Sequence, residues 1–167
     1  MNLVTIVNED DEVIGAKALD ALQHPQDIYR VAVLWLTNSQ GDVLIAQRGL
    51  TKTNSPGLWG PAVAGTIDEG ESYDQNIVKE IQEEIGLTVT IDQLTKGPYQ
   101  KPDLTDTNRR YFRQWYFLVR DLPIGDFIIP RDEVEAIRWV APATLKQELK
   151  YHPERFLPTF SRYVYDF

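Results

Sequence analysis

The chain has 167 residues, of which 43% are hydrophobic and 25% charged, and its formal net charge is −8 at pH 7. Such a chain can bury enough apolar surface to fold as one globular domain without disulfides or a structural metal. It has no cysteine, which excludes disulfides, thiolate zinc sites and cysteine nucleophiles. The strong negative charge argues against binding to a nucleic acid polymer.

The sequence predicts neither a signal peptide nor a membrane span. The chain does not open with a basic segment followed by an apolar run, and no apolar stretch reaches the roughly 20 residues that a bilayer requires. Together with the lack of cysteine, this pattern favours a cytoplasmic location.

The first part of the chain is typical of short strands separated by polar turns. The apolar, β-branched and aromatic segments that predict strands are 3–7, 12–18, 29–37, 43–48 and 58–66. The first two strands should form a hairpin, and the next two should pair around the turn 38–42. Pro61 lies inside the last segment, which indicates an edge strand or a bulge.

A helix follows, because apolar residues then recur at every fourth position. The ridge consists of Tyr73, Ile77, Ile81 and Ile85. Ser72 is the expected N-cap of this helix, and Gly86 is its expected stop.

The remaining chain predicts more strands and two terminal helices. The expected extended segments are 87–99, 109–120 and 136–141, and the expected helices are 142–150 and 153–164, each with a proline near its first turn. In the segment 109–120, one alternating face should join the core and the other should wall a pocket. Strands and helices alternate without a regular βαβ rhythm, so we expect an α/β or α+β sandwich with helices over curved sheets.

Three glutamates crowd the C-terminal half of the first predicted helix. Glu80, Glu83 and Glu84 fall within five positions and follow a loop with three further carboxylates. Each helical residue turns by about 100°, so the three side chains share one arc beside the apolar ridge. Alone, they are compatible with a solvated acidic face. The acidic loop beside them favours another interpretation, because converging carboxylates suit hard cations such as Mg²⁺ or Mn²⁺.

The stretch 65–87 follows the spacing G-x5-E-x7-K-E-U-x-E-E-x-G-U, in which U is a bulky aliphatic residue. The positions that carry it are Gly65, Glu71, Lys79, Glu80, Ile81, Glu83, Glu84, Gly86 and Leu87. This pattern resembles the signature of the Nudix hydrolases, which has arginine where this chain has Lys79. The preceding segment "VLIAQRGLTKTNSPGLWG" is also similar to that family, and the similarity covers most of residues 3–140.

The resemblance implies a single domain over residues 1–167, an α/β/α sandwich around a mixed curved sheet, and a loop–helix–loop motif at 65–87. It also implies hydrolysis of a nucleoside diphosphate-type or other organic diphosphate, with Mg²⁺ or Mn²⁺ as cofactor. We therefore expect a small-molecule partner, no nucleic acid polymer, no membrane, and a monomer or homodimer.

By the same resemblance, Glu80 and Glu84 should bind the metal, and Gly65 should offer its backbone carbonyl to it. Glu83 and Glu80 are the expected catalytic residues, with Glu83 acting as a further ligand or as the base for water. A base supplied by a distant loop is the alternative, and the candidates for it are Glu133 and Glu135.

Other residues are expected to support the site. Glu71 should pair with Lys79 at the start of the helix, although lysine cannot reproduce the planar two-pronged contact of arginine. Three candidates for substrate binding precede the motif, and they are Arg48, Lys52 and Trp59. Arg48 could equally form a surface ion pair, and Trp59 could equally fill the core.

A second resemblance concerns the beginning of the chain. The segment "EDDEVIGAKALDALQH" is similar to the isopentenyl-diphosphate-isomerase branch of the superfamily, and His24 matches a ligand position there. Ala64 and Thr66 stand where that branch has its cysteine and a histidine, and Arg30 replaces another histidine. Isomerase chemistry is therefore the disfavoured alternative, and a catalytically weak binding module is another.

Overall fold

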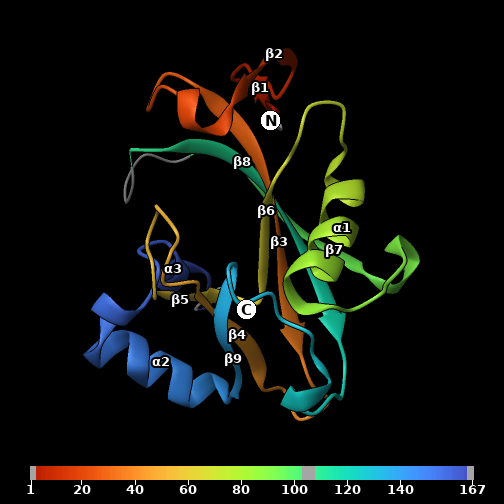
Figure 1. Cartoon of the computed structure of the whole chain (residues 1–167), viewed down its shortest axis with the longest axis vertical. Coiled ribbons are helices and arrows are strands. Elements are labelled where there is room, and N and C mark those ends of the chain that lie inside the picture. Colours follow the sequence, from red (N-terminus) through yellow and green to blue (C-terminus); the bar gives the residue numbers. More distant parts are fainter. Residues whose placement is uncertain (1–2, 103–107, 165–167) are drawn as a thin grey trace.

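A computed structural model describes residues 3–102 and 108–164 of the chain (Figure 1). Its mixed sheet is centred on β3 (Ile28–Thr37), an apolar strand rich in β-branched residues. β8 (Arg110–Val119) runs parallel to β3 over ten residue pairs. β6 (Val63–Thr66) lies antiparallel along the opposite edge of β3.

The predicted N-terminal hairpin is confirmed. β1 (Leu3–Val7) pairs antiparallel with β2 (Val13–Ala18), and β1 also pairs with the first residues of β3. The side-chain oxygen of Asn8 accepts hydrogen bonds from the backbone N–H groups of Asp10 and Glu12, which explains why the polar residues between β1 and β2 form a turn.

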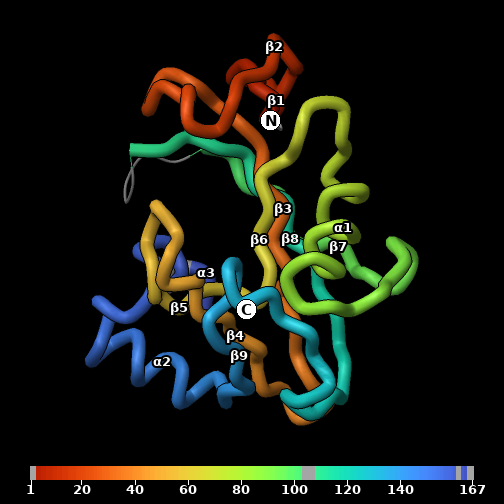
Figure 2. Tube along the Cα trace, viewed as in Figure 1, coloured from red at the N-terminus to blue at the C-terminus, as the bar shows by residue number. Residues whose placement is uncertain are grey.

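The remaining strands extend the sheet on two sides. β4 (Val43–Arg48) pairs with β5 (Trp59–Pro61) and β9 (Val134–Val140), and β7 (Thr95–Gln100) pairs with β8. β3 and β4 pair only next to their shared turn, at Thr37 and Val43. Beyond that point the two strands diverge, as the tube in Figure 2 shows.

Helices cover the sheet on both faces. α1 (Tyr73–Ile85) buries Ile77 and Ile81 against one face, and α2 (Pro142–Tyr151) and α3 (Phe160–Val164) pack on the other. Successive strand residues point to opposite faces, so Leu34 of β3 joins the core under α1 and Val33 joins the core under α2 and α3. The expected mixed sandwich is confirmed. Short 3₁₀ turns occupy Leu19–Ala21, Ile91–Gln93, Ile124–Asp126 and Pro153–Arg155.

The segment 58–66 differs from its predicted form as a single strand. It divides at Ala62 into β5, which pairs with β4, and β6, which pairs with β3. Pro61 has no amide hydrogen to donate to a neighbouring strand, so the chain changes partners there. The predicted pairing of 29–37 with 43–48 is correspondingly reduced to its first residue pair.

Two C-terminal predictions also need correction. Residues 87–94 form no strand, because Thr90 and Gln93 cap a 3₁₀ turn before β7 starts at Thr95. The predicted helix 153–164 is a 3₁₀ turn followed by the short α3, and Pro158 between them cannot continue a helix. None of the helices in the described part of the chain is both long and apolar enough to cross a membrane.

Candidate active site and metal centre

The helix α1 is fixed at both ends by local contacts. The Ser72 hydroxyl accepts the backbone N–H of Gln75 at 3.2 Å, and the Gln75 side chain accepts the N–H of Ser72 at 2.9 Å. This capping box sets the first turn. Gly86 ends the helix with a left-handed φ of 71°, where a Cβ would lie 2.6 Å from Cβ of Ile128. Only glycine suits that position.

Gly65 allows the helix to lie close to β6. A Cβ at this position would lie 2.6 Å from both Cδ of Glu80 and Oδ1 of Asn76, which is closer than real atoms approach. The absence of a side chain at Gly65 therefore creates the space in which the Glu80 carboxylate sits.

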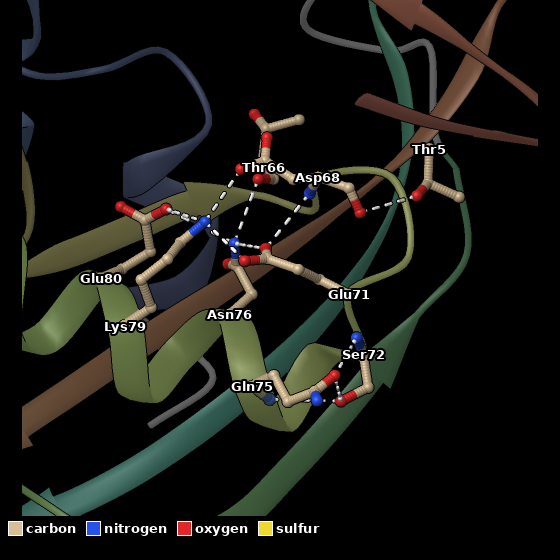
Figure 3. Close-up of polar contacts among 9 residues, drawn as sticks. All are labelled: Thr5, Thr66, Asp68, Glu71, Ser72, Gln75, Asn76, Lys79 and Glu80. Atoms are coloured by element: carbon tan, nitrogen blue, oxygen red, sulfur yellow. Dashed lines mark hydrogen bonds and ion pairs between the residues drawn. The ribbon is translucent and has the colours of Figure 1, made fainter. Parts of the chain in front are cut away.

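Lys79 joins the acidic loop to the helix. Its Nζ lies 2.7 Å from Oε1 of Glu71 and 2.9 Å from Oδ2 of Asp68, but 3.9 Å from Oε1 of Glu80 (Figure 3). Burial alone would lower the pKa of Lys79, yet the hydrogen bonds to these carboxylates outweigh burial and raise it. The same lysine helps to keep the pKa of Glu71 below its usual range, against the effect of burial.

Glu80 and Glu84 have weaker compensation, which does not outweigh burial. Burial raises the pKa of Glu80 to about 7, with Lys79 acting in the opposite direction and Glu83 adding to the rise. Burial and the nearby Glu80 raise the pKa of Glu84 to about 8, although its Oε2 accepts the backbone N–H of Ala64 at 3.1 Å. Two carboxylates that resist ionisation at one place are the donor set that a divalent cation would satisfy.

A cation bound by Glu80 and Glu84 would need further oxygen ligands from water or substrate. Within residues 3–102 and 108–164, no three acidic or histidine side chains already converge on one point. Mg²⁺ in particular keeps several waters and takes one or two carboxylates plus substrate phosphates. Glu83, one residue before Glu84, is exposed on the helix and open to water.

Without a divalent cation, the protein is expected to lose stability between about pH 5 and pH 8. The folded state holds protons on Glu80 and Glu84 that the unfolded chain releases near pH 4.5. The stabilisation present below that pH is therefore lost as the pH rises through about 7 and about 8. One pKa unit corresponds to about 1.4 kcal/mol, and for a chain of this size about 1 kcal/mol shifts the melting temperature by about 2–4 °C. Even one effective unit at each of the two carboxyls should therefore lower the melting temperature by about 5–10 °C in a chelator.

Two controls separate this effect from other titrations. Mg²⁺ or Mn²⁺ should restore most of the lost melting temperature at pH 8, and the variant Glu84→Gln should show a much shallower pH dependence. A wild-type melting temperature in chelator that does not change with pH would contradict this assignment.

A cavity of about 490 Å³ adjoins β6 on the face opposite α1. Ala64, Gly65 and Thr66 form one wall of it, and the same strand contacts Glu80 and Glu84. Aromatic residues from β3, β8 and the C-terminal segment form the other walls. They are Tyr29, Tyr111, Trp115, Phe160 and Tyr163.

The cavity is lined by positive rather than negative side chains. Its described lining contains no carboxylate but three arginines, Arg48, Arg109 and Arg113, together with His24, whose pKa is lowered by burial and by Arg109. Arg113 is 6% exposed, lies 4.0 Å from the centre of the Tyr163 ring, and donates to the Tyr111 hydroxyl at 2.7 Å. In a chain with a net charge of −8, this concentration of positive charge favours an anionic ligand.

The three residues expected to bind substrate lie in different surroundings. Arg48 lines the cavity, donates to the backbone oxygen of Asn54 at 3.0 Å, and lies close enough to Glu84 to oppose the rise of its pKa. Lys52 instead forms an ion pair with Glu133. Trp59 is 9% exposed and packs in the core under the guanidinium of Arg138, outside the described cavity lining.

The alternative bases also differ in position. The charge of Glu133 contributes to the raised pKa of Glu84, so this side chain lies near the glutamate pair while bound to Lys52. Glu135 lies on β9, and its backbone oxygen accepts a hydrogen bond from Arg131 at 3.1 Å. Of the two candidate bases, Glu133 is therefore the one whose charge acts on Glu84.

The positions shared with the isomerase branch do not form a histidine site. Ala64 and Thr66 line the cavity with side chains that cannot supply a thiol or an imidazole. Arg30 is paired with Asp11 at 2.6 Å and is absent from the cavity lining, whereas His24 does reach it. Of the three positions at which that branch has histidine, 24, 30 and 66, only position 24 carries an imidazole in this chain.

Sequence reasoning missed several residues of this region. Asp68 and Asn76 contact Lys79 and Glu80, and Phe160 and Tyr163 close the cavity from the far end of the chain. A signal for Asn76 was present in the sequence, because a polar residue one turn before Glu80 and next to the apolar ridge faces the same side. No local signal connects the C-terminal aromatic residues with β6.

Comparison with known proteins places this geometry in a family. The family model described as NUDIX domain matches residues 28–160. An isopentenyl-diphosphate Delta-isomerase from Nocardia farcinica is 28% identical over 93% of this chain and 88% of its own length. A prenyl-diphosphate phosphatase from Methanosarcina mazei is 27% identical over 93% of this chain and 89% of its own length.

A solved structure supports the same fold. The crystal structure of DR0079 from Deinococcus radiodurans has a TM-score of 0.80 with 26% sequence identity, and the match covers 98% of both chains. The similarity therefore includes the N-terminal hairpin and α3, nearly all of which lie outside the range of the family model.

Proposed function

Since the chain belongs to the NUDIX domain family and is a pyrophosphohydrolase, we propose that it cleaves a diphosphate linkage with the help of a divalent cation. The observation that carries this proposal is the pair Glu80 and Glu84, whose carboxyls have raised pKa values and contact β6, the strand that also lines a cavity with three arginines. A cation would complete that pair, and a diphosphate would bring its own charge to it.

In this proposal, Glu80 and Glu84 would hold Mg²⁺ or Mn²⁺, and the backbone carbonyl of Gly65 would contribute a further oxygen. The cation, when bound, neutralises the diphosphate oxygens and lowers the pKa of a water molecule. Glu83, which is exposed beside the pair, accepts the proton of the attacking water. Lys79 and Glu71 hold the start of α1 against the acidic loop, so the carboxylates stay in place.

The choice of base has a direct test. Glu83→Gln should lower kcat by about 10²–10⁴-fold, the usual contribution of a general base, while Glu133→Gln should lower it by less than about tenfold. Glu133 is the matched control because it is also a glutamate near the site but is paired with Lys52. The reverse order of the two effects would transfer the role to Glu133.

The cavity favours a nucleoside diphosphate-type substrate over a prenyl chain. Tyr111 and Tyr163 line the cavity with half-buried rings that a planar base can contact, whereas the ring of Trp115 is buried in the core. Arg113 lies among these rings and can donate to a base carbonyl or a phosphate, whereas a purely aliphatic chain would leave that buried charge without a ligand contact. Arg48 is placed to contact the phosphates.

A substrate panel tests the proposal as a whole. Nucleoside di- and triphosphates, nucleotide sugars, dinucleotides and prenyl diphosphates are each incubated with the protein in Mg²⁺ or in chelator. We expect Mg²⁺-dependent release of a phosphorylated product from at least one nucleotide and no conversion of isopentenyl diphosphate, since the chain has no cysteine. Isomerase activity, or an absence of hydrolysis across the whole panel, would overturn the proposal.

The remaining expectations are part of the same proposal. Residues 1–167 act as one domain on a small molecule, as a monomer or homodimer, without binding a nucleic acid polymer. A cytoplasmic location is supported only by the lack of cysteine, which fits a reducing compartment.

A further inference from the structure

Position 79 carries a lysine where the family signature has arginine, and the loss of the guanidinium has a geometric consequence. An arginine can donate to both oxygens of one carboxylate, whereas an ammonium group acts as a point charge. Lys79 donates to only one oxygen of Glu71, Oε1, at 2.7 Å, and its other short hydrogen bond goes to Asp68. The second oxygen of Glu71 therefore needs donors from elsewhere.

Asn76 supplies one of them. Its Nδ2 donates to Oε2 of Glu71 at 3.0 Å and to the backbone oxygen of Thr66 at 3.1 Å, and it lies 3.4 Å from Oε1 of Glu80 (Figure 3). The backbone N–H of Asp68 adds a longer contact to the same oxygen of Glu71, at 3.3 Å. Asn76 lies one helical turn before both Lys79 and Glu80, on the same face of the helix.

Burial and helix propensity both disfavour an asparagine at position 76, and only the contacts just described favour it. Asn76 is fully buried in the interior of α1, asparagine is a poorer helix former than alanine by roughly 0.5 kcal/mol, and a buried amide is costly without partners. Its Oδ1 accepts no hydrogen bond within the described residues and lies beside Gly65. The amide nitrogen is thus the part of the side chain that the fold uses.

We propose that Asn76 and Lys79 together replace the family arginine, and that Asn76 is a positioning residue for Glu71 and Glu80. Lys79 supplies the charge and Asn76 supplies the second donor, so the two-pronged grip on Glu71 is divided between two side chains one turn apart. The role of these contacts in positioning Glu80 as a metal ligand rests on the proposed function. The sharing of the hydrogen bonds to Glu71 between Asn76 and Lys79 does not depend on it.

A double-mutant cycle tests the division of roles. The four proteins are wild type, Asn76→Ala, Lys79→Arg and the double variant, and each is titrated with Mn²⁺ by calorimetry. Asn76→Ala should weaken Mn²⁺ binding about tenfold when residue 79 is lysine, the scale of an outer-shell contact. In the Lys79→Arg background the same change should cost less than threefold, because arginine supplies both donors.

A second readout does not depend on metal or catalysis. The unfolding equilibrium of the four proteins in urea and chelator should show the same pattern, a tenfold effect of Asn76→Ala with lysine and less than threefold with arginine. If this coupling is found but no protein binds Mn²⁺, the proposed function fails while the inference about residues 76 and 79 stands.

The matched control is Asn38→Ala, which removes the side chain that caps the turn between β3 and β4, far from the site. Its effect should be equal in both backgrounds. Equal effects of Asn76→Ala in the two backgrounds would overturn the proposal. If Asn76→Ala does not fold with lysine, its recovery by Lys79→Arg counts as support. Failure of both Asn76→Ala and Asn76→Ser to fold with arginine would refute it.

Discussion

Replacing Glu84 by glutamine should lower kcat on the substrate found by the panel by about 10³-fold, equivalent to about 4 kcal/mol of transition-state stabilisation. Glutamine has nearly the same shape and can still accept the N–H of Ala64, which Glu84 accepts at 3.1 Å. It cannot offer a negative oxygen to a cation. The loss should therefore appear in turnover and in Mn²⁺ affinity, not in the fold.

The stability of this variant gives an independent check. Because burial raises the pKa of Glu84 to about 8, the uncharged glutamine should melt at the same or a higher temperature than wild type in chelator at pH 8. Glu154→Gln, on an exposed side chain near the C-terminus, should change neither turnover nor melting temperature. Full turnover by the Glu84 variant would remove this residue from the site.

The second large effect is expected from Gly65→Ala, which should reduce kcat by about 10²-fold. The added methyl group would lie 2.6 Å from Cδ of Glu80 and from Oδ1 of Asn76, so the carboxylate must move away from β6. A misplacement of about 1 Å at a catalytic group can cost about 10²-fold in rate. Overpacking at a buried position should also cost about 1–3 kcal/mol of stability.

Gly15→Ala provides the comparison for this change. Gly15 also lies in a strand, β2, but no described heavy atom lies within 4 Å of a Cβ built there. That substitution should leave both turnover and stability close to wild type. If Gly65→Ala retains full turnover, or if a structure of it shows Glu80 unmoved, the close packing of β6 and α1 is not what positions the carboxylate.

The parts of the site that the sequence predicts best are those set by neighbours in the chain. Ser72 and Gly86 bound the helix through contacts within a few residues, and the apolar ridge fixes which side of α1 faces the sheet. The arc of Glu80, Glu83 and Glu84 follows from helix geometry alone. The N-terminal hairpin can be predicted equally well from the sequence, because its turn is held by the local side chain of Asn8.

The parts that the sequence does not predict depend on distant segments. Pro61 indicates an interruption of the strand, but it does not indicate which partners β5 and β6 join, since this depends on the divergence of β3 and β4. The cavity likewise combines Arg113 of β8 with Tyr163 of α3, about fifty residues further along the chain. Whether Trp59 fills the core or meets a ligand also depends on Arg138, which a local pattern cannot place beside it.

The alternation of side chains along β8 separates two properties of the molecule. Tyr111, Arg113 and Trp115 point into the cavity, whereas Tyr116 and Leu118 support the packing of α1 on the other face. Under the proposed function, a substitution at the half-buried Tyr111 should change which compounds are accepted without disturbing the frame that carries the glutamates, whereas Arg113 and Trp115 are buried. Ligand preference and hydrolytic competence can therefore be altered one at a time, which makes β8 the natural place to redesign selectivity.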